Sequence, residues 1–319
     1  MTENVKQIIT KITNDHQIKS VYFVACGGSL SGFYPAKYFL AENTKTLNVG
    51  YMNANEFVYA TPKDINANAI VILASQRGNT AETVEACKVA NNLNAHTIGL
   101  VFTAPSPLQE AANHAIVYEF GEDSNVALQK SSYGLKLAIE ILQQVEGYDQ
   151  YDQIISDFEK LHDLVVAAKV AVKADAIRFA LDYQDSQMIY MMASGACWGS
   201  AHQEHICILL EMQWIPSCCI HSGEYFHGPF EITEKNTAFV MLKSTGRTRA
   251  LDDRAITFLD KFNENHTIID ASELGLNLSS SEYLEPLFYN NILNVYNVEL
   301  ANQRNHPLTT RRYMWRFAY

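Results

Sequence analysis

The sequence lacks the features that mark membrane, secreted or nucleic-acid-binding proteins. No stretch approaches the roughly 18 apolar residues that a membrane helix needs. Residues 1–17 are polar and of mixed charge, without the apolar core of a signal peptide. Positive charge is also scarce, because 24 Lys and Arg face 35 Asp and Glu, giving a net charge of −11. We therefore expect a cytoplasmic protein that binds neither membranes nor nucleic acid.

The six cysteines also lack the spacing of a metal or redox motif, since none belongs to a C-x-x-C pair. The vicinal pair Cys218-Cys219, followed by His221 and His227, is the one arrangement that suggests a metal site. Structural zinc sites use two separated ligand pairs, which this arrangement does not provide. We expect buried thiols in a reducing compartment, and no metal.

What is present is an alternation of short apolar, β-branched runs with longer helical patterns, such as residues 80–92. This alternation predicts an α/β fold, with parallel sheets covered by helices on both faces. The 319 residues suffice for about two domains. The predicted strands are residues 21–25, 47–52, 69–73, 97–102 and 115–120 in the first half, and 188–192, 238–242 and 266–270 in the second.

The two halves resemble each other. Residues 21–27 (VYFVACG) match residues 189–195 (IYMMASG), and residues 69–75 (AIVILAS) match residues 238–244 (AFVMLKS). Two landmarks in the same order and at a similar spacing favour an internal duplication, with chance likeness of buried strands as the alternative. We predict two tandem domains, residues 1–148 and 149–319.

Polar turns follow two predicted strands of the first half. Residues 26–32 form a turn rich in small residues that contains Ser29, and residues 75–80 supply Ser75, Gln76 and Thr80. Hydroxyls, an amide and backbone N–H groups at the carboxyl ends of parallel strands are typical of a phosphate site. The alternatives are a turn that binds nothing and, for Thr80, a helix cap.

The second half supplies candidate acid–base groups. Glu204, His205 and Glu211 lie in an otherwise apolar pattern, where burial would raise the pKa of a carboxylate. His227 and Glu224 lie in a Gly-bounded aromatic turn, which suits proton transfer near neutral pH. The alternatives are an ion-paired glutamate and a structural histidine.

These segments together resemble the sugar isomerase (SIS) domain family. The resemblance rests on VYFVACGGS, ASQRGNTAET, LLEM and SGEYFHGPFE, which span both halves. It implies two tandem SIS domains whose sugar-phosphate contacts match Ser29, Ser75, Gln76 and Thr80. The catalytic carboxylate matches Glu211, the ring-opening histidine matches His227, and Glu224 matches a further acidic position. In the family, the site lies at a dimer interface, and the histidine comes from the neighbouring subunit.

Within this family, the chain most resembles the fructosamine 6-phosphate deglycases, including the tail from His306 to Tyr313. The resemblance implies hydrolysis of an Amadori 6-phosphate to glucose 6-phosphate and a free amine, without a metal or redox cofactor. The related glucosamine 6-phosphate synthase differs, because it has serine at the position of Arg77 and a catalytic lysine near its C-terminus. No lysine follows Lys261 here. A phosphosugar isomerase or glucosamine 6-phosphate deaminase and a non-enzymatic sugar-phosphate sensor remain the alternatives.

Overall fold

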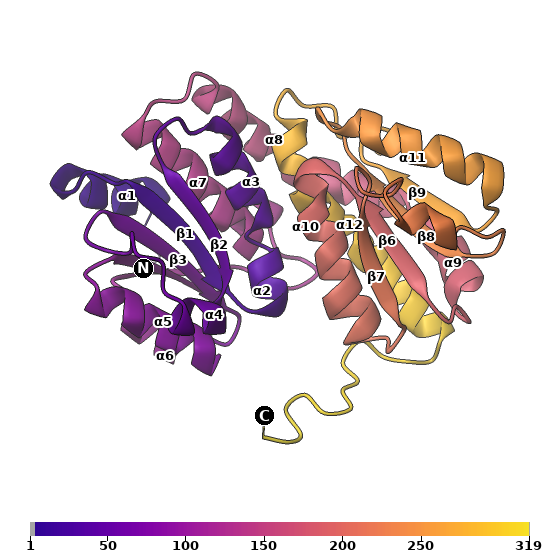
Figure 1. Ribbon diagram of the computed structural model, residues 1–319, viewed down its shortest axis with the longest axis horizontal. Coiled ribbons are helices and arrows are strands. Elements are labelled where there is room, and N and C mark those ends of the chain that lie inside the picture. Colours follow the sequence, from indigo (N-terminus) through magenta and orange to yellow (C-terminus); the bar gives the residue numbers. More distant parts are fainter. Residues whose placement is uncertain (1–3, 319) are drawn as a thin grey trace. The chain divides into compact units, whose positions relative to one another are not determined.

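The computed structural model describes residues 4–318, and the chain divides into two compact units, residues 1–159 and residues 160–319. Each unit has its own parallel β-sheet (Figure 1). The predicted domain boundary at 148/149 stays a prediction.

The sheet of the first unit has five parallel strands in the order β2-β1-β3-β4-β5. All five predicted strands are present, with ends that differ by at most three residues. Their bounds are β1 Ser20–Ala25, β2 Asn48–Asn53, β3 Ala69–Ser75, β4 His96–Val101 and β5 His114–Val117.

Helices cover both faces of this sheet, as predicted (Figure 1). Because side chains alternate along a strand, Phe23 of β1 packs against Phe33 on one face, with 5.6 Å between ring centroids. Its neighbour Val24 belongs to the opposite core, together with Phe57 and Ala86. The helices are α1 Val5–Asp15, α2 Gly27–Ser31, α3 Tyr34–Asn43, α4 Ala54–Tyr59, α5 Ala81–Asn92, α6 Pro107–Ala111, the short 3₁₀-helix η1 Val126–Leu128 and α7 Lys130–Val145.

The sheet of the second unit has the order β7-β6-β8-β9, which repeats the order β2-β1-β3-β4 of the first. The matching segments of the two halves therefore take equivalent places, with β1 and β6 second in the strand order and β3 and β8 third. The strands are β6 Ile189–Ala193, β7 Ser217–His221, β8 Ala238–Lys243 and β9 His266–Asp270.

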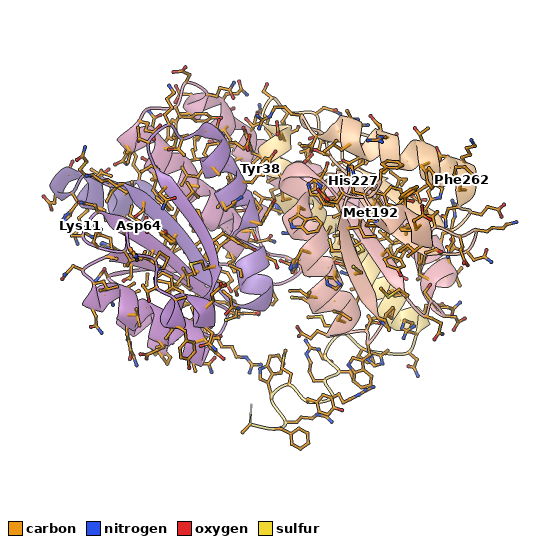
Figure 2. The ribbon with its side chains drawn as sticks, in the orientation of Figure 1. Lys11, Tyr38, Asp64, Met192, His227 and Phe262 are labelled. Atoms are coloured by element: carbon orange, nitrogen blue, oxygen red, sulfur yellow. The ribbon has the colours of Figure 1, made fainter. Side chains whose placement is uncertain are left out.

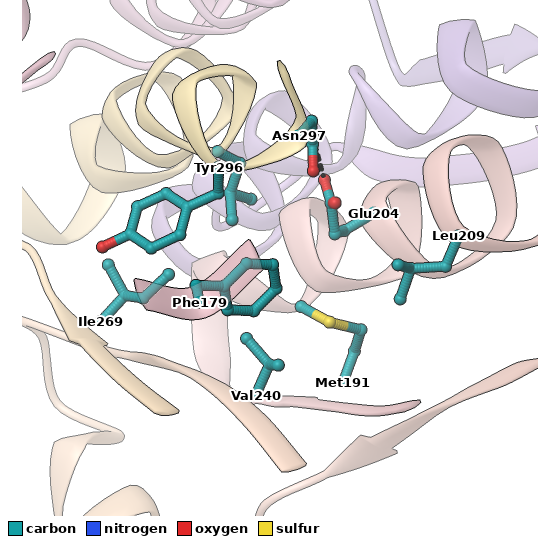
Figure 3. Close-up of a pocket in the computed structure, with 9 residues that line it drawn as sticks. Phe179, Met191, Glu204, Leu209, Val240, Ile269, Tyr296 and Asn297 are labelled. Atoms are coloured by element: carbon teal, nitrogen blue, oxygen red, sulfur yellow. Dashed lines mark hydrogen bonds between the residues drawn. The ribbon is translucent and has the colours of Figure 1, made fainter. Parts of the chain in front are cut away.

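Helices also cover both faces of the second sheet. Met192 of β6 and Met241 of β8 share a core with Leu259 of α11. On the other face, Met191 and Phe179 line a common cavity with residues of α12 (Figure 3). The helices are α9 Lys173–Tyr183, the 3₁₀-helix η2 Gly195–Cys197, α10 Trp198–Gln203, the π-helix η3 Glu204–Leu210, the 3₁₀-helix η4 Pro229–Ile232, α11 Arg249–Phe262 and α12 Ser281–Gln303.

The helical patterns of residues 151–181 form two helices, α8 (Tyr151–Ala171) and α9, because the chain leaves the regular helix at Val172. The single long helix that the sequence pattern favours over residues 125–145 is shorter in the structure, because the segment begins with η1 and α7 starts only at Lys130. Between residues 4 and 318, no helix is long and apolar enough to cross a bilayer.

Candidate functional site

The turn after β1 holds Ser29 on the short helix α2. The Nζ atom of Lys130, the first residue of α7, lies 3.4 Å from Ser29 Oγ and donates to the carbonyl of Gly28 at 3.0 Å. Lys130 therefore brings a positive charge to this turn in an otherwise acidic chain. Sequence reasoning missed Lys130, because its partner lies 101 residues away along the chain.

The turn after β3 brings two of the predicted hydroxyls together. Ser75 Oγ and Thr80 Oγ1 lie 2.9 Å apart, and Ser75 is almost fully buried. Thr80 occupies the N-cap position of α5, but its side chain makes no capping hydrogen bond. The capping alternative therefore does not account for this hydroxyl, and the amino end of α5 keeps N–H groups that an anion would satisfy.

Close packing sets the path of this turn at Gly78, whose φ is +66°. A Cβ atom there would lie 2.1 Å from Ser106 Oγ, so a side chain would force the turn apart. Gln76 and Arg77 are exposed, and the carbonyl of Gln76 accepts from the N–H groups of Phe102 and Thr103.

The two polar turns leave the sheet at the same edge. β1 and β3 are parallel neighbours, with Ala25 in register with Ala74, so both strands end at one level. The structure thus gathers Ser29, Ser75, Gln76 and Thr80 at the carboxyl edge of the first sheet, where open α/β sheets usually bind ligands.

Glu211 follows the π-helix η3 and is half-buried. Its Oε1 atom lies 2.8 Å from Nη2 of Arg311 in the C-terminal tail. Burial raises the pKa of Glu211, and the positive charge of Arg311 opposes that rise. A π-helix lies next to this carboxylate, and such segments are frequent at functional sites.

Glu204 begins the same π-helix and is buried (Figure 3). Asn297 of α12 donates its Nδ2–H to Glu204 Oε2 at 3.1 Å. Burial raises the pKa of Glu204 to about 8, against the effect of this hydrogen bond. The carboxyl group is therefore mostly protonated at neutral pH, and it lies within the core of the second unit.

Glu224 and His227 lie in the turn after β7, and both are exposed. The N–H of His227 donates to the carbonyl of Glu224 at 2.9 Å. Between them, Tyr225 is fully buried among aromatic rings and anchors the turn to the core. This anchoring leaves the side chains of Glu224 and His227 free to point outward.

The structure does not bring Glu211 and His227 together within one chain. β6 and β7 run parallel, with Ala193 in register with His221, so the connection between them must return to the amino edge of the sheet. Glu211 lies late in that connection, six residues before β7 begins, whereas His227 follows β7 at the carboxyl edge. Figure 2 shows His227 at the end of the unit remote from the C-terminal tail, where Glu211 is paired.

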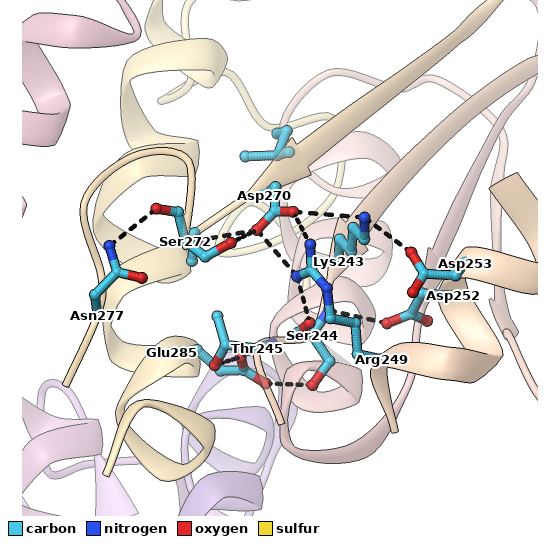
Figure 4. Close-up of polar contacts among 12 residues, drawn as sticks. Lys243, Ser244, Thr245, Arg249, Asp252, Asp253, Asp270, Ser272, Asn277 and Glu285 are labelled. Carbon is cyan, nitrogen blue, oxygen red and sulfur yellow. Dashed lines mark hydrogen bonds and ion pairs between the residues drawn. The ribbon is translucent and has the colours of Figure 1, made fainter. Parts of the chain in front are cut away.

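The second unit has its own polar turn after β8, at the place of the turn that contains Ser75. Here, Ser244 Oγ donates to Glu285 at 2.9 Å, and the N–H and hydroxyl of Thr245 donate to the same carboxylate (Figure 4). Glu285 is fully buried, and burial raises its pKa to about 7. An internal carboxylate thus uses the donors that an anionic ligand would need, and sequence reasoning missed it.

These features define an α/β protein with polar turns at the carboxyl edge of a parallel sheet and a half-buried carboxylate in its second unit. A family model described as the SIS domain matches residues 16–142, the first sheet with its two polar turns. The chain belongs to the SIS domain family.

Its similarity to individual relatives extends over nearly the whole chain. It is 39% identical to fructosamine deglycase FrlB of Bacillus subtilis over 95% of this chain and 93% of that protein. It is 26% identical to fructoselysine 6-phosphate deglycase of Escherichia coli K12, over 87% of this chain and 85% of that one. A Salmonella typhimurium LT2 structure, provisionally assigned as a phosphosugar isomerase, superposes with a TM-score of 0.97 at 52% identity, over 99% of this chain and 96% of that chain.

Proposed function

We propose that this protein is a fructosamine 6-phosphate deglycase, which hydrolyses an Amadori compound 6-phosphate to glucose 6-phosphate and a free amine. The observation that carries the proposal is the similarity, over nearly the full length, to two deglycases of this type. The placement of Glu211, half-buried with a raised pKa, supports it because the reaction needs a general base.

The proposal includes two tandem SIS domains, residues 1–148 and 149–319. The family model matches only part of the first of these ranges. The repeated strand order of the two sheets and the matching segments at β1 and β6 support a second SIS domain.

The first unit would hold the phosphate group of the substrate. Ser29, Ser75, Gln76 and Thr80 offer hydroxyl and amide donors at one edge of the sheet, and Lys130 adds a charge beside Ser29. Binding energy from this remote phosphate orients a reactive end that the site grips weakly by itself.

The chemistry then needs only proton transfers and one hydration, so we expect no metal or redox cofactor. His227 moves a proton between the ring oxygen and the hydroxyl, which opens the sugar ring. Glu211 removes a proton from C1 to form an enaminol and returns a proton to C2, which leaves an imine at C1. Water adds to this imine, and the carbon–nitrogen bond breaks to release the aldehyde of glucose 6-phosphate and the amine. Glu224 would assist at the turn that carries His227.

We further propose a homodimer with a shared active site. Glu211 and His227 lie toward opposite ends of β7, so one chain does not supply both groups to one C1–C2 unit. A second copy that brings its His227 to Glu211 would complete the site. We place the protein in the cytoplasm, in keeping with free cysteines at all six positions.

The test is to incubate the pure protein separately with fructoselysine 6-phosphate and glucosamine 6-phosphate, and to measure glucose 6-phosphate, free amine and ammonia. Glucose 6-phosphate and an equal amount of lysine from the first compound are the expected products. Ammonia and fructose 6-phosphate from the second compound alone would instead establish a deaminase. If neither compound reacts but both raise the melting temperature, the sensor alternative replaces the deglycase.

A further inference from the structure

The C-terminal tail, residues 304–318, is a basic segment of an acidic protein. After Glu299 the sequence has no acidic residue, but it has arginines at 304, 311, 312 and 316. The tail is fastened at its start, because Gln213 donates its Nε2–H to the carbonyl of His306 at 2.9 Å. This fastening brings the positive charge of the tail to Glu211 rather than to open solvent.

Arg311 is fixed next to Glu211, with only 9% of its surface exposed. In addition to the ion pair with Glu211, its Nη1 donates to the carbonyls of Leu308 and Thr310 at 2.8 and 2.9 Å. Its Nε is buried and has no hydrogen-bond partner among residues 4–318. The buried guanidinium therefore keeps a donor for an acceptor on a bound molecule, beside the carboxylate that the proposed function makes the general base.

Arg312 is exposed and lies over the ring of Trp214, 4.3 Å from its centroid. His306 also contacts this ring, with 4.5 Å between centroids. Trp214 itself has a φ of +55°, which is rare for a bulky residue and is found where the surrounding structure enforces it. The stack therefore holds the guanidinium of Arg312 over Trp214, three residues after Glu211 in the sequence, while the adjacent Arg311 pairs with Glu211 itself.

We propose that the two tail arginines recognise a carboxylate on the amine part of the substrate, with Arg312 as the main contact. This inference rests on the proposed function, in which Glu211 acts on C1 and C1 carries the amine. The α-carboxylate of an amino acid linked through its α-nitrogen would then lie close to Glu211, and the two negative charges would repel each other unless cations offset them. The planar fork of arginine matches a carboxylate with two parallel hydrogen bonds.

The test compares two substrates that differ in one charge: the fructosamine 6-phosphates of glycine and of glycinamide. From the usual strength of a hydrogen bond to a charged group, we expect the kcat/KM of the wild type to be roughly ten- to a hundredfold higher for the glycine compound than for the glycinamide compound. Arg312→Ala should reduce this ratio toward one, and Arg312→Lys should leave it between the two values, because lysine keeps the charge but loses the fork.

Arg178→Ala is the matched control, since Arg178 is exposed on α9 outside the tail, and this variant should keep the wild-type ratio. Turnover of both compounds at equal kcat/KM by the wild type would overturn the inference and leave the deglycase function standing. A ratio that Arg312→Ala does not change would also overturn it. If neither these compounds nor fructoselysine 6-phosphate reacts, the proposed function fails, and the inference fails with it.

Discussion

At the residue scale, two opposing effects act on the pKa of Glu211. Burial favours its neutral form, whereas Arg311 at 2.8 Å favours the carboxylate. A general base works best with a pKa near the working pH, and burial moves the pKa of Glu211 upward while Arg311 favours the ionised form that accepts a proton. Arg311 thus acts through Glu211, and its hydrogen bonds to two backbone carbonyls hold that charge in place.

The first prediction concerns Glu211 itself. Glu211→Gln keeps the size of the side chain and a hydrogen-bond acceptor for Arg311 but removes the basic group. We expect the kcat for fructoselysine 6-phosphate to fall by roughly 10²–10⁴-fold. Coupled detection of glucose 6-phosphate measures this loss, and an unchanged melting temperature shows that the fold is intact. A variant with a near-normal kcat would remove Glu211 from the role of base.

The second prediction concerns the hydroxyl pair at the carboxyl edge of the first sheet. Ser75→Ala removes one of two hydroxyls that lie 2.9 Å apart, so a bound phosphate would lose one donor. We expect kcat/KM to fall about tenfold and inorganic phosphate to inhibit less strongly. Ser124→Ala is the control, because the hydroxyl of Ser124 bonds to the carbonyl of Gly121 in another loop of the same unit. Equal inhibition of both variants by phosphate would contradict the assignment of Ser75.

At the scale of elements, the sequence predicted strands wherever apolar, β-branched residues formed a run, as in β3. It missed β7, because Ser217-Cys218-Cys219-Ile220-His221 contains one β-branched residue and follows no alternating pattern. The π-helix was missed for a different reason. A π-helix differs from an α-helix in its i→i+5 backbone hydrogen bonds, and the sequence of residues 204–210 carries no pattern that predicts them.

The same contrast holds for the site. Ser75 and Thr80 are five residues apart, and a local turn brings them together, so their proximity could be predicted from sequence. The ion pair of Glu211 with Arg311 joins residues that are far apart in the sequence, and no local pattern indicates it. The sequence of a single chain therefore predicts the candidate groups, but not the charged residues that shift their pKa values.

The third prediction concerns the pKa of Glu204, the first residue of the π-helix. In the unfolded chain, this carboxyl ionises at its ordinary pKa of 4.5, whereas in the folded protein it keeps its proton up to about pH 8. The folded state then binds more protons than the unfolded state between these values, so the contribution of Glu204 to stability falls as the pH rises from about 4.5 to 8.

Glu204→Gln is neutral at every pH and retains an acceptor for Asn297, so its melting temperature should decline less than that of the wild type between pH 5 and 8. A thermal scan at several pH values in this range measures the difference. Some decline should persist in the variant, because burial also raises the pKa of Glu285. Parallel curves for the wild type and the variant would show that Glu204 does not titrate in this range.

At the scale of the whole molecule, the second sheet repeats the order of four strands of the first, but the turns after β3 and β8 differ. We propose that the turn after β3 binds the phosphate, whereas after β8 the carboxylate of Glu285 accepts the hydrogen bonds of Ser244 and Thr245. A duplicated fold would thus retain one phosphate site per chain. The second unit would contribute Glu211 at one edge of its sheet and His227 at the other.

The last prediction follows from this separation. Mixed dimers are made from Glu211→Gln and His227→Ala chains, each of which should be inactive alone. If each site takes Glu211 from one chain and His227 from the other, a mixed dimer regains one intact site of its two. After unfolding and refolding equal amounts together, about half of the dimers are mixed, so about one quarter of the wild-type activity should return.

The same chains refolded separately and then combined without exchange are the control. Size-exclusion chromatography and two distinct affinity tags show whether mixed dimers have formed. If they have formed and the refolded mixture stays inactive, each active site lies within one chain, and the shared-site arrangement is wrong.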